Sequence, residues 1–345
     1  MPDLRALSTP PPDYDPATQG LVPLMIGPTL QDWEWERDQF RRLWLDYLGH
    51  GPEPVPLNLG LGTEETLEGI TRTLVSYQVE SGCQVEAYLL QPPGEGPFPG
   101  VVVFHQTTSE TIRQPAGFCP PRELQFGLNL ARRGFVTLCP RNYLWDYRGR
   151  PGADTSSEAF RGLVEDELLG RYPQWTGMGK MVWDGRRAVD ALLALPNVDP
   201  ERLGCVGHSL GAKEVLYALA FDERMRAGVS CEGGLGIPFS NWDAPWYLGP
   251  GIHDRPDLEH HQLLALAAPR AMLVLGGGLQ TPADPERNDG CDPVEDWAYL
   301  QAARPAYQLY GVPERLGLYL HPHGHSLPPE AEQLTYEWLE RFLME

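Results

Sequence analysis

Residues 203–213 read Leu-Gly-Cys-Val-Gly-His-Ser-Leu-Gly-Ala-Lys, and this stretch decides the fold. The apolar residues that end at Gly207 predict a buried strand, and the pattern from Ala212 onward is that of a helix. Between them stands a G-x-S-x-G motif centred on Ser209. In the setting of strand, sharp turn and helix, this motif is typical of a serine nucleophile held on a strained backbone. We therefore predict that Ser209 is a nucleophile; the alternative is a glycine-rich turn with an idle serine.

Length, charge and composition limit the classes of protein that fit. The chain has 345 residues, 42% of them hydrophobic, a length that suits a single α/β domain with extensions or two domains. The formal net charge of −20 argues against binding nucleic acid or an anionic membrane through a basic face. No apolar run reaches the roughly 18 residues of a membrane span, and no signal-peptide pattern opens the chain. Six cysteines without a C-x-x-C pair indicate reduced thiols, so we expect a cytoplasmic protein.

Strand and helix patterns alternate along most of the chain. We predict about eight strands, at residues 73–80, 84–91, 100–104, 134–139, 203–207, 227–231, 271–275 and 316–320. Helices are predicted at residues 122–133, 157–169, 179–195, 212–219, 258–267, 293–310 and 330–343. This alternation predicts an α/β fold, with a mostly parallel central sheet and helices on both faces. Ligands of such sheets bind beyond the carboxyl ends of the strands, where Ser209 would lie.

The N-terminal part of the chain differs in composition. Residues 1–28 hold seven prolines, so we expect an extended arm that lies on the surface or on a partner subunit of a homo-oligomer. Aromatic residues recur at helical spacing over residues 31–48, which predicts a helix. Residues 50–69 have the composition of a loop. We therefore divide the chain into an N-terminal arm with an aromatic helix, residues 1–69, and a catalytic domain, residues 70–345.

The loop after the last predicted strand holds three histidines, His321-Pro322-His323-Gly324-His325. A serine nucleophile needs a base, usually a histidine held by an acid. When the serine stands on a turn between strand and helix, called a nucleophile elbow, the histidine is the last of the three residues along the chain. We favour His325, because Gly324 can form the turn that presents it. His323 is the second choice, and His321 still belongs to the strand end. A His-x-His-x-His run could bind a metal, but no upstream Asp or His motif accompanies it, so we expect none.

Two carboxylates are candidates for the acid. The usual position follows the strand before the last one, and there the sequence has Gly276-Gly277-Gly278 and no carboxylate. Asp284 lies further along that loop and could act as the acid if the loop folds back toward the histidine. An aspartate in an ordinary surface loop is an equally good explanation. One strand earlier, Glu232 stands at a strand end, beside glycines that leave room for it. Because a buried carboxylate needs a partner, we prefer Glu232 as the residue that orients His325.

Further residues are expected around the nucleophile. The oxyanion of the reaction needs donors already in place, and we predict the backbone N–H groups of Leu210 and Gln106. Residues 236–256 follow the strand that ends before Glu232 and carry Trp242 and Trp246. These rings suit a sugar face or an acyl group, and packing against the N-terminal helix is the alternative explanation.

Together these motifs resemble those of the α/β hydrolases, in the dienelactone hydrolase and acetyl xylan esterase-like branch. The resemblance covers roughly residues 70–345. It rests on Phe104-His105-Gln106-Thr107-Thr108, on Gly207–Gly211, on Asp222-Glu223-Arg224-Met225 before the Glu232 strand, and on Gly324-His325. It implies an α/β-hydrolase fold and ester hydrolysis that needs neither a metal nor an organic cofactor.

A narrower similarity is to glucuronoyl esterases. In that family a lysine four residues after the nucleophile contacts the sugar, and a glutamate after the following strand serves as the acid. Lys213 and Glu232 occupy those positions. The family commonly has an arginine directly after the nucleophile, whereas this chain has Leu210. The similarity supports Glu232 as the acid and makes Lys213 a candidate substrate contact; an ion pair at the helix N-terminus is its alternative role.

From these patterns we predict a serine hydrolase of carboxylic esters, acting on a small-molecule ester and in particular on acetyl or glucuronoyl esters of carbohydrates. Ser209 would attack the carbonyl, His325 would carry the proton to the leaving alcohol, and Glu232 would hold the imidazole. Because the same triad cleaves amides, a peptidase or amidase is the alternative enzyme. The alternative from another class is a non-catalytic binding protein of the same fold.

Overall fold

The computed structural model describes the chain except residues 1–5, 11–20, 22–23, 25, 152–155 and 280–290. Its centre is a nine-stranded sheet. In spatial order the strands are β1 (Gly60–Leu67), β2 (Ile70–Glu80), β3 (Cys83–Gln91), β5 (Val136–Pro140), β4 (Phe98–Phe104), β8 (Val198–His208), β9 (Met225–Cys231), β10 (Ala271–Gly276) and β11 (Leu316–Leu320). From β5 to β11 neighbouring strands are parallel, while β1, β2 and β3 join antiparallel. The predicted α/β fold with a mostly parallel sheet is confirmed.

The sheet has one strand more than the eight predicted. The prediction of a loop over residues 50–69 is wrong for β1, which pairs antiparallel with β2. β1 is an edge strand, and all of its residues but the last are exposed. Since neither face of β1 is buried, its sequence carries no alternation of apolar and polar residues that would have marked it.

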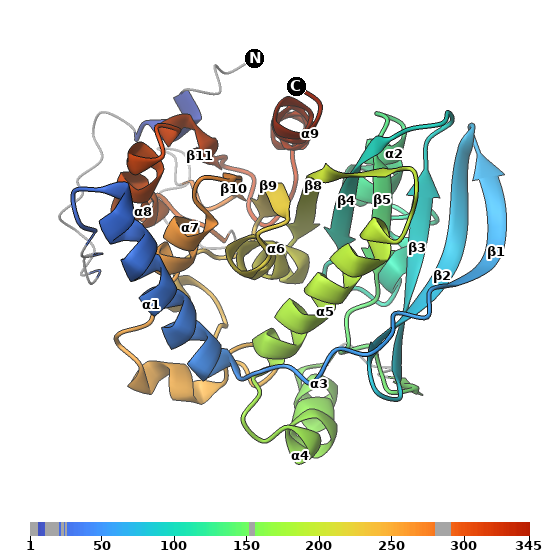
Figure 1. Cartoon of the computed structure of the whole chain (residues 1–345), viewed down its shortest axis with the longest axis horizontal. Coiled ribbons are helices and arrows are strands. Elements are labelled where there is room, and N and C mark those ends of the chain that lie inside the picture. The colour runs from blue at the N-terminus through green and yellow to red at the C-terminus, as the bar shows by residue number, and fades with distance from the viewer. Residues whose placement is uncertain (1–5, 11–20, 22–23, 25, 152–155, 280–290) are drawn as a thin grey trace.

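Helices cover both faces of the sheet (Figure 1). One face carries α1 (Leu30–Leu48), α5 (Gly177–Leu193), α6 (Leu210–Phe221), α7 (His261–Ala267) and α8 (Asp296–Leu309). The other face carries α2 (Phe126–Ala131) and α9 (Pro329–Leu343). The helix predicted over residues 122–133 is shorter, because Gln125 leaves helical geometry after a 3-10 turn and α2 begins only at Phe126.

Smaller elements fill the connections. A two-stranded ribbon pairs β6 (Asp146–Tyr147) with β7 (Arg150–Pro151). Beyond it, α3 (Ser157–Leu163) and α4 (Leu169–Arg171) are joined by a π-helical turn. No helix in the described part of the chain has the length and hydropathy of a membrane span.

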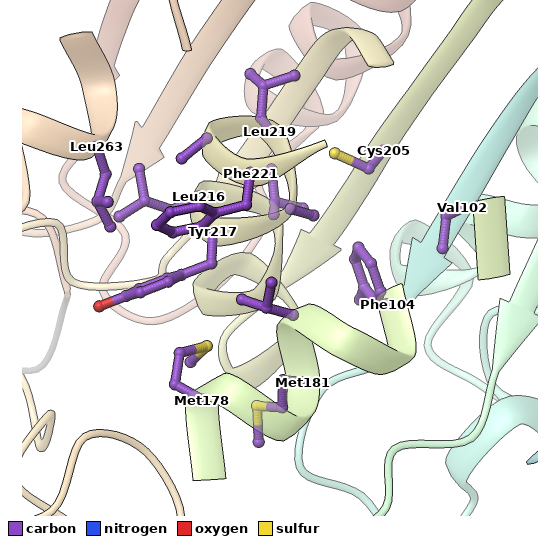
Figure 2. Packing of buried hydrophobic residues seen from close by; sticks show 14 of the residues in the cluster. Val102, Phe104, Met178, Met181, Cys205, Leu216, Tyr217, Leu219, Phe221 and Leu263 are labelled. Atoms are coloured by element: carbon purple, nitrogen blue, oxygen red, sulfur yellow. The ribbon is translucent and has the colours of Figure 1, made fainter. Parts of the chain in front are cut away.

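The helix that follows Ser209 is buried along its whole length. Its residues are mostly apolar, and the two charged ones, Lys213 and Glu214, are buried as well. Figure 2 shows Tyr217 and Leu216 of α6, which belong to one buried cluster with Met178 of α5 and Cys205 of β8. This packing holds the turn that carries Ser209 between a rigid strand and a rigid helix.

The N-terminal helix shares this core. Trp44 of α1 is fully buried, donates to Gln262 Oε1 at 2.8 Å and stacks on the His260 ring with centroids 5.6 Å apart. Most of the predicted arm over residues 1–28 lies outside the described residues. Within the described part, Ser8 Oγ donates to the Leu316 carbonyl at 2.9 Å, so residues 6–8 lie against β11.

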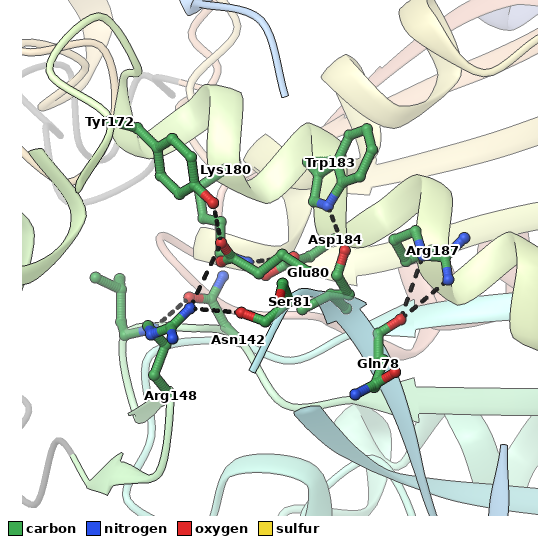
Figure 3. Close-up of polar contacts among 12 residues, drawn as sticks. Gln78, Glu80, Ser81, Asn142, Arg148, Tyr172, Lys180, Trp183, Asp184 and Arg187 are labelled. Carbon is green, nitrogen blue, oxygen red and sulfur yellow. Dashed lines mark hydrogen bonds and ion pairs between the residues drawn. The ribbon is translucent and has the colours of Figure 1, made fainter. Parts of the chain in front are cut away.

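A buried polar cluster fixes α5 to the hairpin of β2 and β3 (Figure 3). Glu80 accepts a hydrogen bond from the Tyr172 hydroxyl at 2.5 Å, and its carboxylate lies 3.2 Å from Lys180 Nζ. Lys180 also donates to Asp184 at 2.6 Å, and Trp183 donates to the Val79 carbonyl at 2.7 Å. A buried charge is costly unless it is paired, and here each has a partner. The cluster therefore anchors the helix that packs beside α6.

Candidate active site

Ser209 stands at the turn between β8 and α6, on a backbone with φ 58° and ψ −116°. Positive φ is rare for residues other than glycine and concentrates at functional sites. Its N–H donates to the Cys231 carbonyl at 2.9 Å, which ties the turn to the neighbouring strand. A Cβ at Gly207 would overlap the Gly211 backbone, and one at Gly211 would overlap the Phe104 carbonyl. The two glycines are therefore required by close backbone contacts.

Glu232 and His325 come together at the carboxyl end of the sheet. Glu232 follows β9 and is almost fully buried, with a φ of 61°. Its Oε2 lies 3.5 Å from Nδ1 of His325 and accepts a hydrogen bond from the Cys291 backbone N–H at 3.0 Å. Since the contact uses Nδ1, the second ring nitrogen, Nε2, is left to take a proton from serine. This is the arrangement of acid and base in a serine triad.

A second histidine lies beside the other carboxylate oxygen. His321 is buried, and its Nε2 lies 3.2 Å from Glu232 Oε1. Sequence patterns placed this residue at the strand end and assigned it no contact with the acid. The close spacing of histidines in one loop was the available signal, but it does not show which carboxylate they face. Two histidine rings therefore lie within 3.5 Å of the Glu232 carboxylate, which also accepts a hydrogen bond from one backbone N–H.

The glycines after β10 explain why that strand carries no carboxylate. A Cβ at Gly277 would overlap the Gly324 carbonyl and would lie 2.7 Å from Glu232 Oε1. The space at this strand end is thus occupied by the histidine loop and by the carboxylate that arrives from β9. Asp284, the alternative acid, lies outside the described residues, and its assignment stays a prediction.

His325 is partly exposed and surrounded by groups that favour its protonated form. The side chain of Cys291 and then the carboxylate of Glu232 raise the pKa of His325 to about 10. Its ring lies against that of His208, with centroids 4.8 Å apart. Cys291 and Glu232 therefore stabilise the imidazolium form of His325.

His208, the residue before the nucleophile, contacts a chain of two glutamine side chains. His208 is buried, which lowers its pKa to about 3, and its Nδ1 lies 3.0 Å from Gln106 Oε1. Gln106 donates in turn to Gln114 at 3.0 Å, and Gln114 to the Pro120 carbonyl at 3.3 Å. A neutral His208 therefore links Gln106 to the strand end beside Ser209. Sequence patterns gave no sign of this chain of contacts.

The two residues predicted to stabilise the oxyanion lie at the ends of adjacent strands. Gln106 follows β4, which pairs with β8 up to Phe104 and Gly207. Leu210 is the first residue of α6, where backbone N–H groups have no acceptor within the helix. Donation by these two N–H groups stays a prediction.

Lys213 is buried and points into the protein. Its Nζ donates to the Gly233 carbonyl and to Ser240 Oγ, each at 2.7 Å, and lies 3.8 Å from the centre of the Trp242 ring. Trp242 and Trp246 are also almost fully buried, and Trp246 packs edge-on against Phe160 with centroids 5.8 Å apart. Contact of these side chains with a substrate stays a prediction.

Replacing Lys213 with methionine is expected to flatten the rise of stability with pH. Burial lowers the pKa of Lys213 to about 7, against an ordinary value of 10.5. Between these pH values the unfolded chain binds a proton that the folded chain has released, so the lysine makes the free energy of unfolding increase with pH. Methionine does not titrate, so the variant lacks this contribution to the pH dependence. Urea unfolding at pH 7 and pH 9 measures the difference.

The control for this experiment is Lys180→Arg, which removes the other lysine of the chain and keeps its charge. Its stability should rise between pH 7 and pH 9 as that of the unmodified protein does. Parallel pH dependence of the Lys213→Met variant and the unmodified protein would contradict the shifted pKa.

Comparison with known proteins supports the fold and covers the turn that carries Ser209. The model of the dienelactone hydrolase family matches residues 85–245. The hydrolase YtaP of Bacillus subtilis is 26% identical over 293 residues, which is 80% of this chain and 91% of that protein. The 4-O-methyl-glucuronoyl methylesterase 1 of Wolfiporia cocos is 24% identical over 53% of this chain. The chain matches only 50% of the length of that methylesterase.

Solved structures show the same fold. A glucuronoyl esterase from Solibacter usitatus superposes with a TM-score of 0.66 and 16% identity, over 92% of this chain and 98% of the other. A structure from Bacteroides fragilis, described as an acetyl xylan esterase, has a TM-score of 0.67 and 15% identity, over 87% and 78% of the two chains. The chain therefore has the fold of the α/β hydrolases, its residues 85–245 match the dienelactone hydrolase family, and glucuronoyl and acetyl xylan esterases are among its structural neighbours.

Proposed function

We propose that this hydrolase cleaves carboxylic esters of carbohydrates through a triad of Ser209, His325 and Glu232. One observation carries the proposal: the buried Glu232 carboxylate faces Nδ1 of His325 at 3.5 Å, at the end of the sheet where Ser209 stands on its strained turn. A carboxylate in this place fixes the tautomer and orientation of the imidazole. No metal or organic cofactor takes part in the proposed reaction.

The reaction proceeds in two steps. Ser209 Oγ attacks the ester carbonyl carbon while His325 takes its proton, and the tetrahedral oxyanion is held by the N–H groups of Leu210 and Gln106. His325 then gives the proton to the leaving alcohol, which leaves the acyl group on Ser209. Water, activated by the same histidine, releases the acid and restores the serine. Glu232 stabilises the imidazolium in both steps.

The proposed substrate class is a glucuronoyl or acetyl ester of a carbohydrate. Relatives and structural neighbours carry the names of these esterases, and Lys213 stands four residues after Ser209, where glucuronoyl esterases have a lysine. The chain has Leu210 where those enzymes commonly have an arginine, and Leu210 is buried. Oxyanion stabilisation would thus rest on backbone donors.

A panel of substrates tests this function. We expect turnover of p-nitrophenyl acetate, of acetylated xylo-oligosaccharides and of the methyl ester of glucuronate, and no cleavage of a peptide p-nitroanilide. The Ser209→Ala variant, purified in parallel, is the control for contaminating esterases. Cleavage of the anilide without cleavage of any ester would replace the proposal with a peptidase or amidase. Intact folding without turnover of any member of the panel would point to a binding protein.

A further inference from the structure

Three side chains with metal-binding atoms meet beside the proposed triad. A carboxylate oxygen of Glu232, the sulfur of Cys291 and a ring nitrogen of His325 all lie within 4.8 Å of one another. In the part of the chain that the structure describes, no other three such side chains form a group of this kind. They come from three separate segments: the end of β9, the stretch before α8 and the loop after β11. The fold therefore assembles the group.

The distances are those of a small tetrahedral site. Zinc binds imidazole nitrogen and carboxylate oxygen at about 2.0–2.2 Å and thiolate sulfur at about 2.3 Å, so neighbouring ligand atoms lie about 3.5 Å apart. Nδ1 of His325 and Oε2 of Glu232 are 3.5 Å apart before any ion is bound. The Cys291 sulfur lies within 4.8 Å of a ring nitrogen of His325 and of a carboxylate oxygen of Glu232.

Charge and exposure also suit a divalent ion. The Glu232 carboxylate is almost fully buried, whereas Cys291 is half-buried and the His325 side chain is 37% exposed. An ion can therefore reach the group from solvent, and a water molecule can take the fourth position. A thiolate, an imidazole and a carboxylate favour Zn²⁺ over Mg²⁺ or Ca²⁺, which prefer oxygen ligands.

We propose that Glu232, Cys291 and His325 bind Zn²⁺ and that the bound ion switches the hydrolase off. On binding, the Cys291 thiol and Nδ1 of the His325 imidazolium each lose a proton to solvent, and the ion is held by the thiolate, one carboxylate oxygen and Nδ1 of His325. A neutral ring bound through Nδ1 carries its remaining proton on Nε2. That nitrogen can then no longer accept the proton of Ser209. The ion is an inhibitor, and catalysis does not require it.

The two halves of this inference are independent. Binding of Zn²⁺ follows from the three side chains alone, whereas inhibition rests on the proposed function. The Ser209→Ala variant separates them, because it keeps all three ligands and lacks the nucleophile. Failure of the triad assignment would therefore leave the binding result standing.

The binding experiment is calorimetric titration of the untagged, metal-free protein with Zn²⁺. We expect one saturable site in the unmodified protein and in Ser209→Ala. Cys291→Ser should weaken binding by at least about 100-fold, since losing even an outer-shell partner costs about 10–100-fold. Titration with Co²⁺ should give a thiolate-to-cobalt charge-transfer band that Cys291→Ser lacks. Cys119→Ser is the matched control, because Cys119 is the other half-buried cysteine, and it should leave both signals unchanged.

Inhibition is measured on p-nitrophenyl acetate, with each variant compared with its own metal-free rate. Zn²⁺ should inhibit the unmodified enzyme and the Cys119→Ser variant, and a chelator should restore their rates. Cys291→Ser should need at least about 100-fold more Zn²⁺ for the same inhibition. The inference is overturned if Zn²⁺ does not bind at one saturable site, or if Cys291→Ser binds it as tightly as the unmodified protein does. Binding without inhibition would overturn the switch.

Discussion

Replacing Ser209 with alanine is expected to lower kcat for ester hydrolysis by a factor on the order of 10⁶ while leaving the fold intact. The substitution removes only Oγ, the atom that attacks the carbonyl. Alanine keeps the Cβ, so the cost of the positive φ at this turn is the same in both proteins. The rate on p-nitrophenyl acetate and covalent labelling by a fluorophosphonate probe measure the loss, and circular dichroism checks the fold.

Ser230→Ala is the matched control for this substitution. Ser230 is a buried serine of β9, and its Oγ donates to the Ala212 carbonyl at 3.1 Å. Losing this bond should cost about 1 kcal/mol of stability and leave hydrolysis within a few-fold of its ordinary rate. A Ser209→Ala variant that hydrolyses the ester as fast as Ser230→Ala would show that the activity does not depend on this serine.

The turn that carries Ser209 could be predicted because the residues that form it are adjacent in sequence. The strand, the two glycines, Ser209 and the helix are adjacent in sequence, and the close contacts of Gly207 and Gly211 are made within this unit and with the neighbouring strand β4. The alternation of the remaining strands and helices likewise follows from burial on both faces of the sheet. Such buried elements carry apolar patterns that a sequence reveals directly.

Other parts of the fold leave no such pattern. β1 is exposed on both faces, and so its residues show no periodicity. The surroundings of Lys213 are an example: its amine contacts Gly233 and Ser240, which belong to an irregular segment. A segment without repeating structure gives no sequence signal of the contacts that it makes.

The site shows the same division. The contact of Glu232 with His325 could be predicted because Glu232 directly follows one parallel strand and His325 lies in the loop after another, and the carboxyl ends of these strands share one edge of the sheet. β10 lies between their strands, and the contact depends on the absence of a side chain at Gly277. The approach of Cys291 and His321 to the same carboxylate depends on loop paths. Loop paths are set by tertiary contacts, which sequence patterns do not encode locally.

Replacing Glu232 with glutamine is expected to lower kcat by about 10⁴-fold, the loss seen when the acid of a serine triad becomes an amide. The carboxylate lies 3.5 Å from Nδ1 of His325 and fixes the proton on that nitrogen, so that Nε2 is free to act as the base. An amide NH₂ group in the same place would favour the other tautomer, with its proton on Nε2. The amide also provides no negative charge for the imidazolium. Steady-state rates on the best ester of the panel measure the loss.

Asp284→Asn is the comparison that decides between the two candidate acids. We expect this variant to keep its activity within a few-fold, because Glu232 already faces His325 at the position where a triad acid acts. Both substitutions exchange one carboxylate for an amide of the same size, so a difference in rate reports the role of the charge and not of the volume. Loss of activity in Asp284→Asn alone would assign the acid to Asp284. In that case Glu232, held by His321 and the Cys291 backbone, would serve to position the histidine loop.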